Sequence, residues 1–191
     1  MADAVSLTDA GTSLSSLQAQ FERAGLRLEG TCAGLSRYGL QWRQTAALIE
    51  DLTLEEADTL GALMPLLRAR AGQALITEGD VGDWMLLLLE GTVDVTKHAE
   101  NGRVSRLAVV KQGTAVGEMS MLDAAPRYAT CTALDDVQAG VLTRAAIARL
   151  IQDHPAIGAK LLVKLTQLLA QRLRNTSTQL VKLLQQPKSR D

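Results

Sequence analysis

The C-terminal part of the chain shows a helical repeat of hydrophobic positions. Between Pro155 and about Gln186, apolar residues recur at alternating steps of three and four residues, close to the coiled-coil spacing of about 3.5. This pattern predicts one long helix with an apolar seam. A helix of this length cannot bury its seam on its own domain alone, so we expect a homodimer through residues 155–187. The seam positions are Leu162, Leu165, Leu169, Leu173, Thr176, Leu180 and Leu183.

Shorter helices are predicted on both sides of the middle of the chain. The segment 144–154 has helical periodicity, and Thr143 is placed to cap it. Residues 45–63 are typical of two helices, the second opened by a capping box of Thr53 and Glu56.

The first 44 residues are predicted to form an N-terminal extension. Residues 1–12 are small and polar, which favours disorder. From Ser13 to about Trp42, apolar residues fall at roughly helical spacing despite four glycines, so short helices are expected there. This extension contains no interpretable motif.

The segment 70–142 has a different pattern. Short apolar runs alternate with glycines, as in "QALITEGD" and "WMLLLLEGTVDV", which predicts an antiparallel sandwich or small barrel. Asn101-Gly102 suits positive φ angles, so "ENGR" at 100–103 predicts a hairpin turn.

Composition excludes several classes of protein. The 191 residues are 47% hydrophobic with a net charge of −1, which predicts a folded domain and no general attraction to nucleic acids or membranes. Only 3% of residues are aromatic, too few for a base-stacking surface. The N-terminus lacks signal-peptide features, and the apolar run at 84–89 is too short to span a bilayer, so we expect a cytoplasmic protein without membrane contact.

The chemistry-bearing residues do not suggest an enzyme. Cys32 and Cys131 are about a hundred residues apart and are expected to be free, partly buried thiols. His98 and His154 have no ligand-spaced neighbours, and no nucleophile–base pair stands out. We therefore expect no catalytic site, no metal site and no cofactor.

One segment carries candidate chemistry, "VGEMSMLDAAPRYATC" at 116–131. Glu118 directly follows a glycine, and Arg127 follows a proline nine positions later. If a short helix begins at Glu118, the N–H groups of Met119 and Ser120 point to a possible anion. Arg127 suits a phosphate and an ionised Glu118 accepts from a hydroxyl, so a phosphorylated sugar fits. The alternative is an ordinary surface ion pair.

Residues 116–130 resemble the phosphate-binding cassette of cyclic nucleotide-binding domains. That cassette has Gly-Glu, an apolar and a small residue, then Pro-Arg, a variable residue, and Ala-Thr or Ala-Ser, as in "VGEMSMLDAAPRYAT". Upstream, "EGDVGDWMLLLLEGTVDV" resembles the family's strand–turn–strand segment, with glycines at the expected turns, and "NGRVSRLAVVKQGTAVGE" continues it. The resemblance extends from about Thr45 to Gln186.

The resemblance implies an α+β fold: an antiparallel, jelly-roll-like β-roll at residues 45–154, flanked by helices and followed by a long dimerisation helix. It also implies that Glu118 accepts from the ribose 2′-hydroxyl and that Arg127 pairs with the cyclic phosphate. The other residues that it assigns to the ligand are Gly117, Met119, Ser120, Tyr128 and Ala129 in the cassette, with Leu107, Val110 and Val116 as an apolar wall.

The long helix resembles the dimer helix of the bacterial catabolite activator family. Its "QRLRNTS" is similar to a stretch whose Thr-Ser pair reaches the adenine base, which implies that role for Thr176 and Ser177. Alternatively, Thr176 only sets the register of the seam. The helix is about one turn longer than that family's usual spacing. Tyr128 replaces a usually small residue, so the base preference stays open.

The sequence therefore predicts a non-enzymatic sensor that binds a cyclic nucleotide, cAMP first, with cGMP possible. The given chain stops at Asp191 directly after its helix, so we expect output through a partner protein rather than direct DNA binding. Two alternatives keep the same fold. One binds cyclic di-GMP, for which the basic C-terminal segment would suit a second phosphate, and the other is a dimerisation scaffold without ligand.

Overall fold

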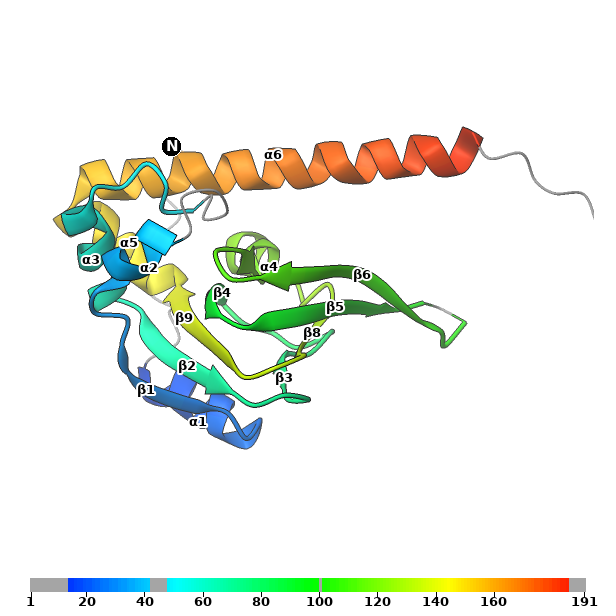
Figure 1. Ribbon diagram of the computed structural model, residues 1–191, viewed down its shortest axis with the longest axis horizontal. Coiled ribbons are helices and arrows are strands. Elements are labelled where there is room, and N and C mark those ends of the chain that lie inside the picture. The colour runs from blue at the N-terminus through cyan, green and yellow to red at the C-terminus, as the bar shows by residue number, and fades with distance from the viewer. Residues whose placement is uncertain (1–13, 42–47, 100, 186–191) are drawn as a thin grey trace, which may run out of the picture.

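The computed structural model describes residues 14–41, 48–99 and 101–185, which form six helices and nine strands (Figure 1). In chain order the elements are α1 (Leu14–Arg23), β1 (Arg27–Thr31), α2 (Leu35–Gln41), α3 (Leu54–Ala62), β2 (Pro65–Ala69), β3 (Ala74–Ile76), β4 (Trp84–Glu90), β5 (Thr92–His98), β6 (Val104–Lys111), β7 (Ala115–Val116), α4 (Glu118–Asp123), β8 (Thr130–Ala133), β9 (Val137–Thr143), α5 (Arg144–Asp153) and α6 (Pro155–Gln185).

The strands form two antiparallel sheets that make up the β-roll. One sheet has the order β1-β2-β9-β4-β7, and the other has the order β3-β8-β5-β6. Each strand pairing within them is antiparallel. The fold is therefore the α+β fold with an antiparallel β-roll that the sequence predicted.

Strand β4 lies between two hydrophobic clusters, which explains its continuous apolar run. Met85, Leu87 and Leu89 pack in the cluster that joins the first sheet to the helices. Leu86 and Leu88, which point to the opposite face, pack between the two sheets and against α1. A strand that is buried on both faces has no polar alternation, so its sequence reads as unbroken hydrophobicity.

The buried apolar contacts of helix α6 with the body come from its first half. Ile157, Leu161 and Leu165 are buried in the helix-side cluster. From Leu173 to Gln185 every residue is exposed. Figure 1 shows α6 as one rod along the molecule, whose C-terminal half extends away from α3 and α5.

Ion pairs connect the first half of α6 to the segment around α3. Lys160 contacts Glu56 at 2.7 Å. Lys164, whose side chain is nearly buried, contacts Asp51 at 2.9 Å and also Glu50. These pairs hold α6 against the same end of the molecule as its apolar contacts do.

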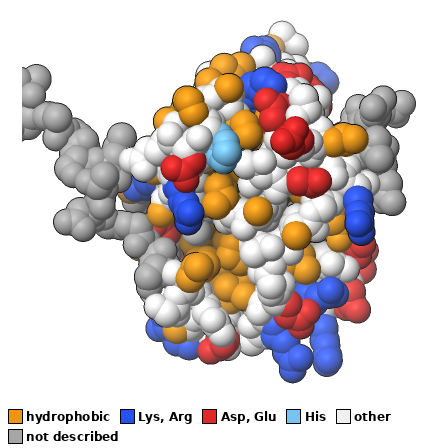
Figure 2. All heavy atoms as spheres, turned by 90° about the vertical axis from the view of Figure 1, so that its left-hand side faces the viewer, with side chains coloured by type: hydrophobic (Ala, Val, Ile, Leu, Met, Phe, Trp, Pro, Cys, Tyr) orange, Lys and Arg blue, Asp and Glu red, His pale blue; other side chains and the backbone are white. Residues whose placement is uncertain are grey.

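Figure 2 shows this end of the molecule, where α2, α3 and α5 lie. Hydrophobic side chains gather in a hollow near the middle of the face, and charged side chains surround it. Partly buried residues, among them Tyr38 of α2 and Leu52 and Leu63 on either side of α3, pack against the helix-side cluster. Among the described residues, no helix is both long enough and apolar enough to cross a bilayer.

The local signals read from the sequence are confirmed where they concern caps and turns. Thr53 accepts from Glu56 N while the Glu56 side chain accepts from Thr53 N, as a capping box requires. The hydroxyl of Thr143 caps α5. Strands β5 and β6 form the predicted hairpin, in which Gly102 has a φ of 76°, whereas Asn101 does not have the positive φ expected of it.

Two predictions about the first part of the chain were wrong. Residues 27–31 form a strand rather than a helix, because β1 pairs with β2 at the edge of the first sheet. Residues 48–52 form a turn or bend instead of the end of a helix. The predicted disorder at 1–12 concerns residues outside the described ranges.

The prediction of two free thiols is confirmed. Cys32 and Cys131 are both free and buried. Burial raises the pKa of the Cys32 thiol to about 12, and it also raises the pKa of Cys131 to about 12. Both side chains are therefore thiols, not thiolates, at neutral pH.

Candidate functional site

The cassette begins where β7 ends and α4 begins. Gly117 is the residue before α4 and has a φ of 80°, which disfavours any residue with a side chain. A Cβ atom there would come within 2.8 Å of Ile76 Cδ1 and 2.9 Å of Arg127 Nη1. Glycine at this position therefore lets the backbone turn and lets the arginine approach closely.

Glu118 is fully buried, with 0% of its surface exposed. Its Oε1 accepts from Nη1 of Arg172, which reaches it from α6. Its Oε2 is buried and finds no hydrogen-bond partner among the described residues. The carboxylate thus has one oxygen occupied by the long helix and one oxygen free to accept.

Arg127 is also buried, with 3% of its surface exposed. Its Nη1 donates to the carbonyl oxygen of Gly117 at 2.8 Å, and its Cζ lies 4.1 Å from the ring centre of Trp84. Its Nη2 finds no partner within the described part of the chain. Burial lowers the pKa of this guanidinium to about 10, so it remains charged at neutral pH.

The backbone around Arg127 is fixed by the turn that precedes β4. The N–H of Arg127 donates to the carbonyl of Asp80 at 2.8 Å, and its own carbonyl accepts from the N–H of Gly79 at 2.9 Å. On the other side, α4 is followed by its C-cap residue Ala124, whose φ is 59°. Two neighbouring turns therefore set where the arginine side chain leaves the backbone.

Arg172 was not identified from the sequence as a site residue. Its Nη2 donates to the carbonyl of Ala115 at 2.5 Å, next to its pairing with Glu118. Its sequence signal was available: it precedes Thr176 by four residues, so the two lie on one face of α6 a turn apart. The contact with Glu118 shows that this turn of α6 lies at the cassette.

The structure brings some of the other predicted residues together and leaves others at the surface. Val116 and Ser120 are buried beside Glu118, Ala129 is half-buried, and Val110 packs partly against the inter-sheet cluster. Met119, Leu107 and Tyr128 have exposed side chains. Thr176 and Ser177 are exposed on α6, in its unpacked half.

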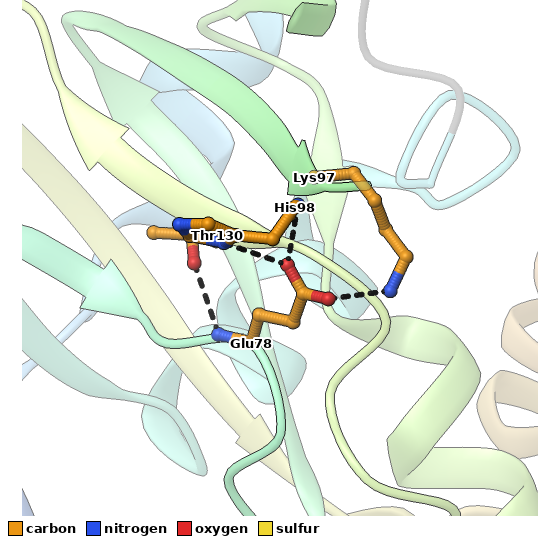
Figure 3. A network of polar contacts seen from close by, with 4 residues as sticks. All are labelled: Glu78, Lys97, His98 and Thr130. Atoms are coloured by element: carbon orange, nitrogen blue, oxygen red, sulfur yellow. Dashed lines mark hydrogen bonds and ion pairs between the residues drawn. The ribbon is translucent and has the colours of Figure 1, made fainter. Parts of the chain in front are cut away.

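Tyr128 is held from the side by a polar cluster. Nζ of Lys97 lies 4.6 Å from the centre of its ring and 2.6 Å from Oε1 of Glu78. The other carboxylate oxygen of Glu78 accepts from the backbone N–H of His98 and contacts its Nδ1. Thr130 Oγ1 accepts from the N–H of Glu78, which closes the network that Figure 3 shows.

The cassette was also compared with the donor set that a metal site needs. Within these ranges, no group of three or more His, Cys, Asp or Glu side chains is arranged to hold a metal ion. The two polar atoms without partners in the cassette, Glu118 Oε2 and Arg127 Nη2, offer one acceptor and one donor instead. The arrangement suits a ligand with a hydroxyl and an anionic group.

A family model described as the cyclic nucleotide-binding domain matches residues 66–154, which include the whole cassette. A solved cyclic nucleotide-binding domain from Methylobacillus flagellatus is 30% identical, with a TM-score of 0.73 over 95% of this chain and 96% of that chain. The catabolite activator protein of Thermus thermophilus is 30% identical, with a TM-score of 0.65 over 72% of this chain and 62% of its own.

A curated relative is similar over part of the chain. The "CRP-like cAMP-activated global transcriptional regulator" of Mycobacterium tuberculosis is 32% identical over 113 residues, 59% of this chain and 49% of the regulator. The chain thus spans about half the length of this relative. Fold, cassette and matches agree, and the chain belongs to the cyclic nucleotide-binding domain family.

Proposed function

We propose that the protein is a non-catalytic sensor of a 3′,5′-cyclic nucleotide, with cAMP as the first candidate. The observation that carries this proposal is the pair of buried atoms without partners, Glu118 Oε2 and Arg127 Nη2. A buried polar atom without a partner costs about 1–3 kcal/mol, so a ligand that satisfies both atoms gains binding free energy at both. A cyclic nucleotide has a ribose hydroxyl and a phosphate that match them.

The proposed roles follow from charge and hydrogen-bonding capacity. Glu118, when ionised, can only accept, so we assign it to the ribose 2′-hydroxyl. Arg127 can only donate, so we assign it to the cyclic phosphate. The matched relative from Mycobacterium tuberculosis is named as cAMP-activated, and a fungal relative that is 33% identical is a cAMP-dependent protein kinase regulatory subunit, which supports cAMP as the ligand.

We further propose that the protein is a homodimer through α6 and that the ligand acts on this helix. Arg172 on α6 shares the Glu118 carboxylate that we assign to the ribose. A ligand that changes this shared contact would favour one position of α6 over another, which is what a switch requires. Thr176 and Ser177 follow one turn later and remain the candidate contacts to the base.

We propose that the output goes to a protein partner rather than to nucleic acid. Three of the five cations on α6, at positions 160, 164 and 172, pair with carboxylates of the body. They are therefore not free to bind phosphates. This argues against binding of nucleic acid by α6, and also against a second phosphate site for cyclic di-GMP. The net charge of −1 agrees with this.

A second candidate function is a dimerisation scaffold without ligand. Arg172 already occupies one oxygen of Glu118 and a carbonyl of β7, so α6 can rest on the cassette with the ligand absent. In such a scaffold, Oε2 of Glu118 would have no ligand to bind. Binding measurements separate the two candidates.

The test is calorimetric titration of the purified protein with cAMP, cGMP and cyclic di-GMP. We expect cAMP to bind, and Arg127→Ala to weaken it at least tenfold, because a charge-assisted hydrogen bond contributes about 1.5–3 kcal/mol. Glu118→Gln should weaken binding by about tenfold on the same basis. Arg106→Ala, which removes an exposed pair with Asp94, is the matched control and should leave affinity unchanged.

Two outcomes would contradict the proposal. If none of the three nucleotides binds while the protein remains a folded dimer, the scaffold is the better description. If Arg127→Ala and Glu118→Gln bind as the unmodified chain does, the ligand binds outside the cassette. Tighter binding of cGMP than of cAMP would keep the site and correct the ligand.

A further inference from the structure

We propose that Trp84, held in place by helix α1, is a positioning residue for Arg127. It fixes the guanidinium in the orientation that presents Nη2 to an anionic ligand group. The inference rests on the proposed function, because it concerns the phosphate end of that site. It adds the N-terminal extension to the site, although α1 lies outside the residues 66–154 that the family model matches.

Two contacts together set the plane of the guanidinium. The ring of Trp84 lies 4.1 Å from Cζ of Arg127, so the cation rests against the aromatic face. Nη1 of Arg127 donates to the carbonyl of Gly117 at 2.8 Å. The ring and the carbonyl restrict both tilt and rotation, and Nη2 is the end that has no partner among the described residues.

Trp84 is fixed in turn by two residues of α1. Phe21 packs against it with ring centres 4.7 Å apart at an angle of 54°. The indole Nε1 donates to Oε1 of Gln20 at 3.3 Å. Phe21 and Trp84 are both buried, so the indole has a stable position before any ligand binds. The contacts run from α1 through Trp84 to Arg127.

Gly82 supplies the room for this arrangement. A Cβ atom at this position would come within 2.5 Å of Nη2 of Arg127 and 3.0 Å of Nε1 of Trp84. The guanidinium and the indole edge therefore pack so closely on the backbone of Gly82 that a side chain there would clash with them. A small hollow of about 60 Å³ adjoins them, lined in part by Gln20, Phe21, Trp84 and Arg127.

A long arginine side chain that is free to rotate loses rotamer entropy when it binds a phosphate. One that is already held by a ring and a carbonyl loses less, so preorganisation improves affinity without adding a ligand contact. The opposing interpretation is that Trp84 is only an aromatic residue of the core. The two interpretations differ in what a substitution that keeps the ring should do.

The experiment measures the dissociation constant of cAMP for Trp84→Leu and Trp84→Phe. We expect Trp84→Leu to bind about tenfold more weakly, since it loses the aromatic face. Trp84→Phe keeps a face under the cation and should stay within about threefold of the unmodified chain. Thermal melting of each variant shows whether it is folded.

The contribution of α1 is tested by a second pair of variants, one at Gln20 and a control at Gln18. Gln20→Ala removes the hydrogen bond to the indole, together with a long one to the carbonyl of Val81, and should weaken cAMP binding by about two- to threefold. Gln18→Ala on the same helix removes only an exposed contact with Glu22 and should have no effect.

A spectroscopic readout tests the stack without any ligand. The chain has two tryptophans, so Trp42→Phe leaves Trp84 as the single indole emitter. In that background, Arg127→Met should change the emission of Trp84, because it removes a cation from the ring face. Unchanged emission would overturn the proposed contact even if Trp84→Leu proves too unstable to study.

The remaining outcomes are decisive as well. If cAMP binds a folded Trp84→Leu variant as tightly as the unmodified chain, this inference is wrong and the proposed function stands. If Trp84→Phe is as weak as Trp84→Leu at equal stability, the indole acts through packing and not through its aromatic face, which also overturns the inference. If the unmodified chain binds no cyclic nucleotide, the proposed function fails and this inference fails with it.

Discussion

At the scale of single residues, Glu78 joins three segments of the chain beside Tyr128 (Figure 3). Hydrogen bonds from the backbone of His98 and the ammonium of Lys97 lower the pKa of Glu78 from 4.5 to about 2. Its charged form is therefore favoured by the fold. This contribution is present above the unfolded pKa and is lost as the pH falls from about 4.5 toward 2.

We predict that Glu78→Gln melts at a lower temperature than the unmodified chain at pH 7, and that the difference shrinks steadily below about pH 4.5. Thermal unfolding followed by circular dichroism between pH 2.5 and 7 measures it. Glu90→Gln, an exposed carboxylate hydrogen-bonded to Gln138, is the control. A difference that grows toward acidic pH would mean that Glu78 is not stabilised as its anion.

The site shows which residues a sequence can and cannot indicate. Glu118 and Arg127 could be predicted because one short segment carries both, together with the glycine and proline that shape it. Arg172 is 54 residues from Glu118, and Trp84 belongs to another strand, so no local pattern links them to the cassette. Their roles depend on how α6 and β4 pack against the cassette. The hydrophobic pattern within each of these elements does not specify that packing.

At the scale of elements, the start of α3 combines a local signal with a long-range contact. Glu56 takes part in the capping box with Thr53 and also pairs with Lys160 of α6. We predict that Thr53→Ala lowers the free energy of unfolding by about 1 kcal/mol, because an N–H at the helix start loses its acceptor. Urea unfolding measures this change.

The same helix contains a matched control. Thr59 has its hydroxyl bonded back to the carbonyl of Glu55 inside α3, so it caps nothing. Thr59→Ala should be neutral or slightly stabilising, since alanine has the higher helix propensity. If both substitutions destabilise equally, the loss at Thr53 comes from packing and not from the cap.

Elements with strong local signals could be predicted, and elements formed by pairing could not. Helix α5 has a capping residue and α6 an apolar repeat, and both match their predicted bounds closely. Strand β1, "RLEGT", contains a glycine and little hydrophobic alternation, so its sequence does not predict a strand. It is a strand because β2 offers it an edge, and this pairing is a tertiary contact.

At the scale of the whole molecule, α6 has an apolar seam that is exposed from Leu173 to Gln185 in the described part of the chain. Leu173, Leu180 and Leu183 are 69%, 56% and 65% exposed. Three leucines in line at these exposures are typical of an interface, and the proposed homodimer would cover them with the same residues of a second copy. Arg172, which shares the Glu118 carboxylate, directly precedes the exposed part of this seam.

We predict that Leu180→Glu raises the dimer dissociation constant about a hundredfold or more. Two leucines are lost from the interface at about 1.5–3 kcal/mol each, and two carboxylates are brought together. Sedimentation equilibrium over a range of concentrations measures the change. Thr178→Glu adds the same charge two residues away, on the opposite side of the helix, and should leave the dimer intact.

If Thr178→Glu dissociates the dimer equally, or if the unmodified chain is a monomer at high concentration, the seam is not the interface. The switch would then have to act within one chain, through Arg172 and Glu118 alone.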